Sequence, residues 1–79
     1  MSKEAIKEAI LQKLDKLDRG DGFTIYDVAE ELIRDGMMIP DTHYYDNRPT
    51  SATVGEAIWE LYELGLVRFD PIKRRFYKP

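Results

Sequence analysis

The chain has 79 residues, of which 43% are hydrophobic and 34% are charged, and it contains no cysteine. This length allows one domain, residues 1–79, with a single modest core, and the composition is that of a folded chain. The absence of cysteine excludes a disulfide framework and a thiolate metal site. No apolar run approaches a membrane span and the start lacks a signal-peptide core, so we expect a cytoplasmic protein without a membrane partner.

The net charge is −3, but the charges are unevenly distributed along the chain. Residues 20–65 carry two bases and ten acids, whereas residues 66–79 carry five bases and one acid. Such asymmetry suits a domain that faces a polyanion with one edge. The alternative is that lysine and arginine on a C-terminal edge strand prevent strand-on-strand aggregation.

Residues 2–18 are predicted to form a first helix, because apolar residues recur at helical spacing, at Ile6, Ile10, Leu14 and Leu17. Two glycines between residues 20 and 22 then signal a turn. Phe23 stands alone after this turn, which predicts a short strand or an anchor in the core.

A second helix is predicted over residues 25–35. Thr24 and Asp27 form an approximate capping box, and an apolar stripe follows at Ile25, Val28, Ala29, Leu32 and Ile33. Gly36 is expected to end the helix, and its charged outer side is expected to be solvated.

Residues 37–49 lack periodicity and contain two prolines, which predicts a long loop. A loop of this length is often functional, so it is a second candidate site. Its apolar and aromatic residues have three interpretations: packing on the core, a surface for a partner or for self-association, or a platform for nucleic-acid bases. The candidate partner-binding residues are Met37, Met38, Tyr44 and Tyr45, with Ile39 beside them.

Chemistry of other kinds finds little support. Asp41, His43 and Asp46 have a spacing that resembles a metal site, but one histidine and two loop aspartates lack preset geometry, so we expect no metal and no cofactor. No nucleophile, base or phosphate-binding motif is present, and the prediction is that the chain is not an enzyme.

A third helix is predicted over residues 51–64, with Thr50 or Ser51 as the N-cap and Gly65 as the C-terminal residue of a Schellman motif. Its expected core stripe is Val54, Ile58, Leu61 and Leu64. Trp59 lies one position off this stripe, and we expect it to be buried. Residues 66–78 then read as a basic hairpin around the turn Asp70-Pro71-Ile72-Lys73.

The order of these elements resembles the winged helix-turn-helix superfamily of bacterial and archaeal transcription regulators. The resemblance covers residues 24–77 and rests on two sequence motifs. The first is Thr24, Asp27, Val28 and Ala29 at the second helix, and the second is Thr50, Ala52, Thr53 and Val54 followed by Leu61, Leu64, Gly65, Leu66 and Val67. It implies an α+β fold of three helices, a short strand before the second helix and a C-terminal β-hairpin wing.

The resemblance further implies that double-stranded DNA is the partner, bound by a small transcriptional or replication-control regulator acting as a dimer. The third helix would enter the major groove and the wing would hold the backbone or the minor groove. The implied DNA-binding residues are Arg48, Thr50, Ser51, Thr53, Arg68, Lys73, Arg74, Arg75 and Lys78. The alternative is a protein-interaction module, for example in a phage or mobile-element protein, whose acidic third helix and tyrosine loop meet a basic partner.

Overall fold

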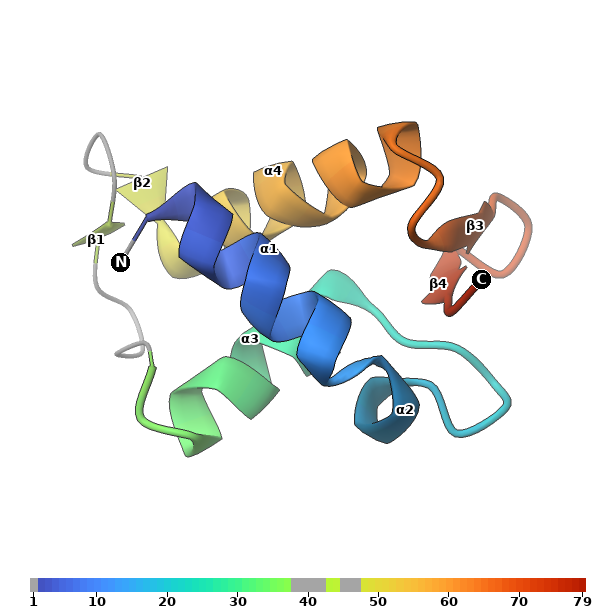
Figure 1. The fold of residues 1–79 in the computed structure, drawn as a ribbon, viewed down its shortest axis with the longest axis horizontal. Helices are drawn as coiled ribbons and strands as arrows, with labels where there is room; N and C mark the ends of the chain where they lie inside the picture. The colour runs from blue at the N-terminus through green and yellow to red at the C-terminus, as the bar shows by residue number, and fades with distance from the viewer. Residues whose placement is uncertain (1, 38–42, 45–47) are drawn as a thin grey trace.

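The computed structural model describes residues 2–37, 43–44 and 48–79, with only the backbone described for residues 43–44 and 48–51. In this part of the chain the protein is a small α+β fold with four helices and two short antiparallel hairpins (Figure 1). The helices are α1 (Lys3–Gln12), α2 (Leu14–Leu17), α3 (Ile25–Arg34) and α4 (Thr50–Glu63). The strands are β1 (His43–Tyr44), β2 (Arg48–Pro49), β3 (Arg68–Asp70) and β4 (Arg75–Tyr77).

The predicted first helix is divided into two, so the prediction of one helix over residues 2–18 was wrong at one position. At Lys13 the backbone has φ −108° and ψ 9°, and its N–H donates to the carbonyl of Ile10 instead of continuing the α-helical pattern. The single turn of α2 follows. Ile6 and Ile10 are fully buried, but Leu14 and Leu17 beyond the break are only partly buried.

Helix α3 confirms the predicted capping box. The Thr24 hydroxyl accepts from the Asp27 N–H at 3.1 Å, and the Asp27 carboxylate accepts from the Thr24 N–H at 2.9 Å. The helix ends at Arg34, and Gly36 follows with φ +74°, a conformation that glycine adopts without strain. Local sequence signals therefore set both ends of this helix.

Helix α4 ends in the predicted Schellman motif. The Leu66 N–H donates to the Leu61 carbonyl at 2.9 Å and the Gly65 N–H to that of Tyr62 at 3.0 Å. Because the helix ends at Glu63, Leu64 lies outside the apolar stripe and is 65% exposed, so its expected burial was wrong.

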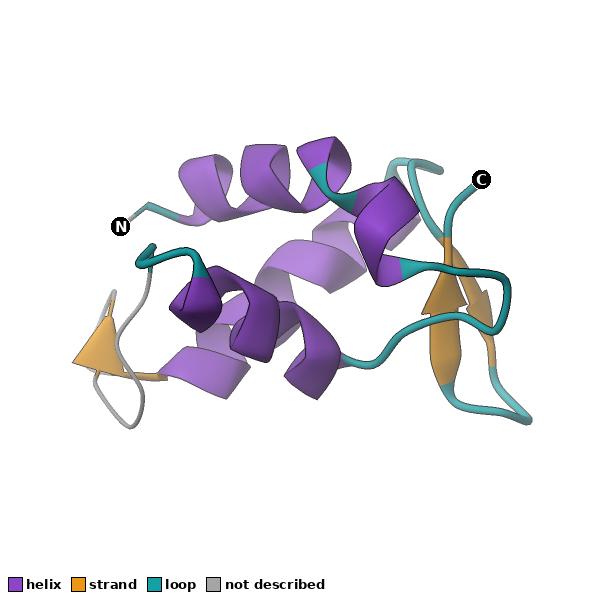
Figure 2. Cartoon of the chain, turned by 90° about the horizontal axis from the view of Figure 1, so that it is seen from below, coloured by secondary structure: helices purple, strands orange, loops and turns teal. Residues whose placement is uncertain are grey.

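The core lies where α4 packs against α1 on one side and α3 on the other, and Figure 2 shows the C-terminal hairpin closing one end of this helical layer. Its fully buried larger side chains come from α1, α3 and α4, from Phe23 and from the residue before β3, and include Ile6, Ile10, Phe23, Val28, Leu32, Val54, Ile58, Leu61 and Val67. None of the described helices has the length and apolar content needed to cross a bilayer.

The C-terminal hairpin pairs Arg68 with Tyr77, Phe69 with Phe76, and Asp70 with Arg75. Phe23 adds a third, single-residue strand, since its N–H and carbonyl both bond to Phe76 at 2.8 Å. The predicted strand before the second helix is thus one bridge long. Strand alternation directs Phe69 and Phe76 to one side of the hairpin and the charged residues and Tyr77 to the other.

The connection predicted as a loop over residues 37–49 contains the short pairing of β1 with β2, in which Tyr44 lies opposite Arg48. Met37 packs against the core, in agreement with one of the three interpretations of this segment. Met38, Ile39 and Tyr45 lie outside the described residues, as does the side chain of Tyr44. Asp41 and Asp46 of the rejected metal motif lie outside them as well.

Candidate nucleic-acid interface

The basic side chains of the helices are neutralised by carboxylates. Lys3 contacts Glu56 at 3.0 Å and Glu60 at 2.5 Å, and Lys7 contacts Glu60 at 3.2 Å. Five further pairs join cations on or next to the helices to nearby carboxylates, namely Lys7 with Glu4, Lys13 with Asp35, Lys16 with Glu31, and Arg34 with Glu30 and Glu31. These cations are therefore already compensated.

The arginines and the tip lysine of the C-terminal hairpin differ. Within the described part of the chain, no carboxylate pairs with Arg68, Lys73, Arg74 or Arg75. We call these four residues the hairpin cations. They form a concentration of positive charge that the fold itself leaves uncompensated.

Backbone geometry holds the tip of the hairpin in one shape. One Asp70 carboxylate oxygen accepts from the N–H groups of Ile72 and Lys73, at 2.8 and 3.2 Å, and the Asp70 carbonyl accepts from Arg74 at 2.7 Å. Arg74 has φ +57°, in the left-handed region that closes such a turn. Lys73 and Arg74 are both exposed on this fixed tip.

The two remaining hairpin cations are oriented by uncharged groups. Arg75 donates to the carbonyls of Asp21 and Gly22, each at 3.4 Å, and Arg68 donates to the carbonyl of Lys78 at 3.2 Å. The Arg68 guanidinium also lies 5.7 Å from the centre of the Tyr77 ring. These contacts fix the side chains but leave their charge available to an anion.

Lys78 contributes less than the prediction assumed. Its ammonium pairs with Asp15 at 3.0 Å, and this hydrogen bond raises the pKa of Lys78 above its ordinary value. Its backbone N–H donates to the buried carboxylate of Asp18 at 3.0 Å. Lys78 therefore mainly attaches the C-terminal end of the chain to α2 and its C-cap.

A shallow hollow of about 260 Å³ lies on the hairpin, lined by Arg68, Phe69, Asp70, Lys73 and Tyr77. Gly22 supports it from behind, because a Cβ atom at that position would lie only 2.9 Å from the Tyr77 ring. Sequence reasoning identified the two cations but missed Phe69, Asp70 and Tyr77. The alternation of the strands and the aspartate before Pro71 were the available signals.

At the start of α4 the structure corrects the predicted site. Thr53 is 0% exposed, so it is a core residue and its hydroxyl does not reach a ligand. The side chains of Arg48, Thr50 and Ser51 lie outside the described residues. The start of α4 and the hairpin lie at opposite ends of the molecule, whose longest extent is 30 Å (Figures 1 and 2). The two predicted parts of the DNA contact, the start of the third helix and the wing, are therefore not adjacent in the fold.

Helix α4 is acidic, since residues 50–63 contain three glutamates and no lysine or arginine. Glu56 and Glu60 face α1, and the hydrogen bond from Lys3, followed by that from Lys7, holds the pKa of Glu60 below its ordinary value. Glu63 is exposed. This helix offers no cation of its own to a phosphate.

Trp59 is only partly buried, contrary to the expectation of burial. It is 39% exposed, and its ring packs edge-on against Phe69 and Phe76, with centroids 4.8 and 4.9 Å away. Tyr62 beside it is 44% exposed. An aromatic surface therefore runs from α4 to the base of the hairpin.

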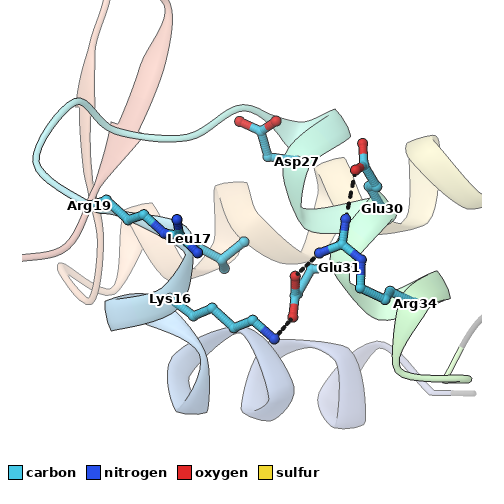
Figure 3. A pocket seen from close by; sticks show the side chains of 7 residues that line it. All are labelled: Lys16, Leu17, Arg19, Asp27, Glu30, Glu31 and Arg34. Carbon is cyan, nitrogen blue, oxygen red and sulfur yellow. Dashed lines mark hydrogen bonds and ion pairs between the residues drawn. The ribbon is translucent and has the colours of Figure 1, made fainter.

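A second hollow, of about 180 Å³, lies between α2 and α3, and sequence reasoning did not single it out (Figure 3). At its centre Glu31, which is 5% exposed, pairs with Lys16 at 2.6 Å and with Arg34 at 3.0 Å. Its lining combines these residues with Leu17, Arg19, Asp27 and Glu30, so three cations face three carboxylates. This internal balance indicates a structural network joining two helices.

Comparisons with protein-family models, with curated proteins and with solved structures found no match for this chain. No group of three metal-ligating side chains converges among the described residues. The candidate functional residues are therefore those of the hairpin and of the helices beside it.

Proposed function

We propose that this chain is a winged-helix domain that binds double-stranded DNA, with the C-terminal hairpin as the main contact. Two features support the fold assignment. Apart from the short α2 and the β1–β2 pair, the order of elements is helix, single-residue strand, helix, helix and hairpin, and Phe23 bonds to β4 of that hairpin at Phe76. The hairpin is then the wing.

The single observation that carries the functional proposal is the contrast in charge pairing. The described cations of α1, α2 and α3 are matched with carboxylates, whereas the four hairpin cations are not. Two of them lie on a tip whose backbone is held by the Asp70 carboxylate, so little backbone freedom is lost on binding. An edge strand that needs only to resist aggregation does not require such a fixed tip.

In this mechanism the hairpin cations neutralise phosphates and release the counterions condensed on the duplex. The contact fixes the position of the domain without reading bases. Pairing of Glu56 and Glu60 with the α1 lysines weakens their repulsion of the DNA backbone. This arrangement suits a small regulator in which residues outside the hairpin read the bases. The predicted residues for that role are Arg48, Thr50 and Ser51.

The test is a fluorescence anisotropy titration of a short duplex over a series of salt concentrations, starting near about 50 mM, where electrostatic affinity is high. The variant Lys73→Ala with Arg74→Ala should weaken binding to every duplex and reduce the slope of log K against log salt by about two.

A matched control is Lys13→Ala with Arg34→Ala, which removes the same charge from cations that are already paired with carboxylates. This control should retain the slope. An equal loss in both double variants would show that only net charge matters, and the absence of duplex binding by the unaltered chain would refute the proposal.

The second candidate function is a protein-interaction module, and one observation favours it. Trp59 and Tyr62 are about 40% exposed on a helix whose charged residues are all acidic. Exposed aromatic side chains are enriched in protein interfaces. Under this alternative, Tyr62→Ala would abolish capture of a basic protein partner while the hairpin double variant would have no effect.

A further inference from the structure

The hollow on the hairpin has a composition that differs from that of a site for backbone phosphates alone. It places two cations, Arg68 and Lys73, beside one carboxylate, Asp70, and the ring of Tyr77. Phe69 also lines the hollow, but its ring packs against Trp59 and Phe76 on the other side of the hairpin. Cations alone suffice for a phosphate, whereas an aromatic ring beside cations is the combination that holds an unstacked base together with its phosphate. The volume, about 260 Å³, lies just below the range typical of sites for small organic ligands.

We infer that this hollow binds one unpaired nucleotide, so that the preferred ligand is a duplex carrying a single-stranded extension. The inference rests on the proposed function and specifies its ligand. The Tyr77 ring and the Arg68 guanidinium beside it provide the surface for the base, and Lys73 holds the phosphate. A base inside a duplex cannot use this surface, because its faces are covered by neighbouring bases.

The Tyr77 ring is already positioned for this role in the unbound protein. Gly22 has φ +78° and no side chain, which lets its backbone lie against both Phe76 and the Tyr77 ring. The guanidinium of Arg68 is positioned by its bond to the Lys78 carbonyl. The two groups therefore do not need to be ordered when a base arrives.

Asp70 gives the hollow a preference among bases. One of its carboxylate oxygens accepts from two N–H groups of the turn, and the other makes no hydrogen bond within the described residues. A free carboxylate oxygen accepts from an exocyclic amino group, which adenine, cytosine and guanine carry and thymine lacks. The hollow should therefore favour amino-bearing bases over thymine.

The experiment compares a blunt duplex with the same duplex extended at both ends by short single strands of deoxyadenosine, deoxycytidine or thymidine. Anisotropy titrations should show tighter binding of the adenine and cytosine extensions than of the blunt duplex. The affinity for the adenine and cytosine extensions should exceed that for the thymine extension by about tenfold, which is the factor supplied by one hydrogen bond to a charged group.

Two variants sharpen the test. Asp70→Asn keeps an oxygen for the turn and replaces the free oxygen by an amide donor, so the preference for amino-bearing bases over thymine should be lost. Tyr77→Ala should remove the advantage of every extension, by about tenfold or more. Tyr26→Ala is the control, because Tyr26 is a 75% exposed tyrosine on α3, away from the hairpin.

The outcomes separate this inference from the proposed function. Equal binding of blunt and extended duplexes would overturn the inference and leave duplex binding intact. An adenine preference that survives Asp70→Asn would also overturn the assigned role of Asp70. Failure of the chain to bind any of the DNAs would refute both proposals. Loss of the preference in Asp70→Asn, in a protein with an unchanged melting temperature, supports the inference.

Discussion

Gly22 shows how one residue links the body of the protein to the candidate site. Its φ of +78° is costly for other residues, and an added Cβ would lie 2.8 Å from the Phe76 carbonyl that bonds to Phe23. The sequence predicted a turn from two nearby glycines, but the close approach of β4 involves a contact more than fifty residues away and has no local signal.

Gly22→Ala should therefore be more damaging than a left-handed glycine substitution in open space. We expect a loss of at least about 2 kcal/mol in the free energy of unfolding, since a steric clash adds to the backbone cost. Gly36→Ala is the matched control, with φ +74° and, among the described residues other than its chain neighbours, no atom within 4 Å of the added Cβ, and should cost about 1 kcal/mol. Urea denaturation measures both, and equal losses would contradict the proposed contact.

Thr53 and Leu64 show the limits of sequence reasoning about single residues. Thr53 belongs to a motif shared with DNA-binding domains, yet it points into the core and is 0% exposed. Leu64 continues an apolar stripe, yet the chain has already left the helix, and the residue is 65% exposed. The spacing of apolar residues predicts which face of a helix is buried. It does not predict which positions along the helix are covered by a neighbouring element.

Among the elements, the hairpin depends on Asp18 for its attachment. The carboxylate is 4% exposed and accepts from the N–H groups of Gly20, Gly22 and Lys78, at 2.9, 3.1 and 3.0 Å. It thus joins the end of α2, the glycine turn and the residue after β4. These bonds, that from Gly20 foremost, lower the pKa of Asp18 although burial opposes them.

Asp18→Asn should reduce the free energy of unfolding near neutral pH by about 1–3 kcal/mol, because a charged acceptor of three N–H groups is lost. A lowered pKa in the folded state means that this contribution is present above the unfolded pKa of about 3.9 and is lost as the pH falls through the folded value. The difference between the two proteins should therefore shrink below about pH 4.

Thermal denaturation at several pH values measures this difference. Asp15→Asn is the control, because its carboxylate is exposed and contacts only the Lys78 ammonium in the described structure. A difference between the unaltered protein and Asp18→Asn that stays constant down to about pH 2 would contradict the account of Asp18.

Elements with strong local signals were predicted well, and those decided by packing were not. The capping box of α3 and the Schellman motif of α4 are local and are confirmed. The break at Lys13 has no glycine or proline to announce it. This break separates α1, which is tightly packed, from the single turn of α2, where Lys16 pairs with Glu31 on α3.

At the scale of the whole molecule, two causes concentrate positive charge on the hairpin. The C-terminal segment is rich in basic residues, and ion pairs with carboxylates neutralise the basic residues of the helices. The sequence predicted a basic C-terminal segment within a chain of net charge −3. It did not predict that Glu56 and Glu60 would be matched by Lys3 and Lys7, because these pairs join residues 53 or more positions apart. The uncompensated cations of the hairpin emerge only from this three-dimensional arrangement.

The most direct test of the central claim is a titration of the isotopically labelled protein with a short duplex, followed by amide chemical shifts in two-dimensional NMR spectra. The account predicts that the largest changes fall on residues 68–78, with the exposed faces of α1 and α3 unaffected. Changes confined to α4 and its acidic face, with the hairpin silent, or no changes at low salt, would contradict it.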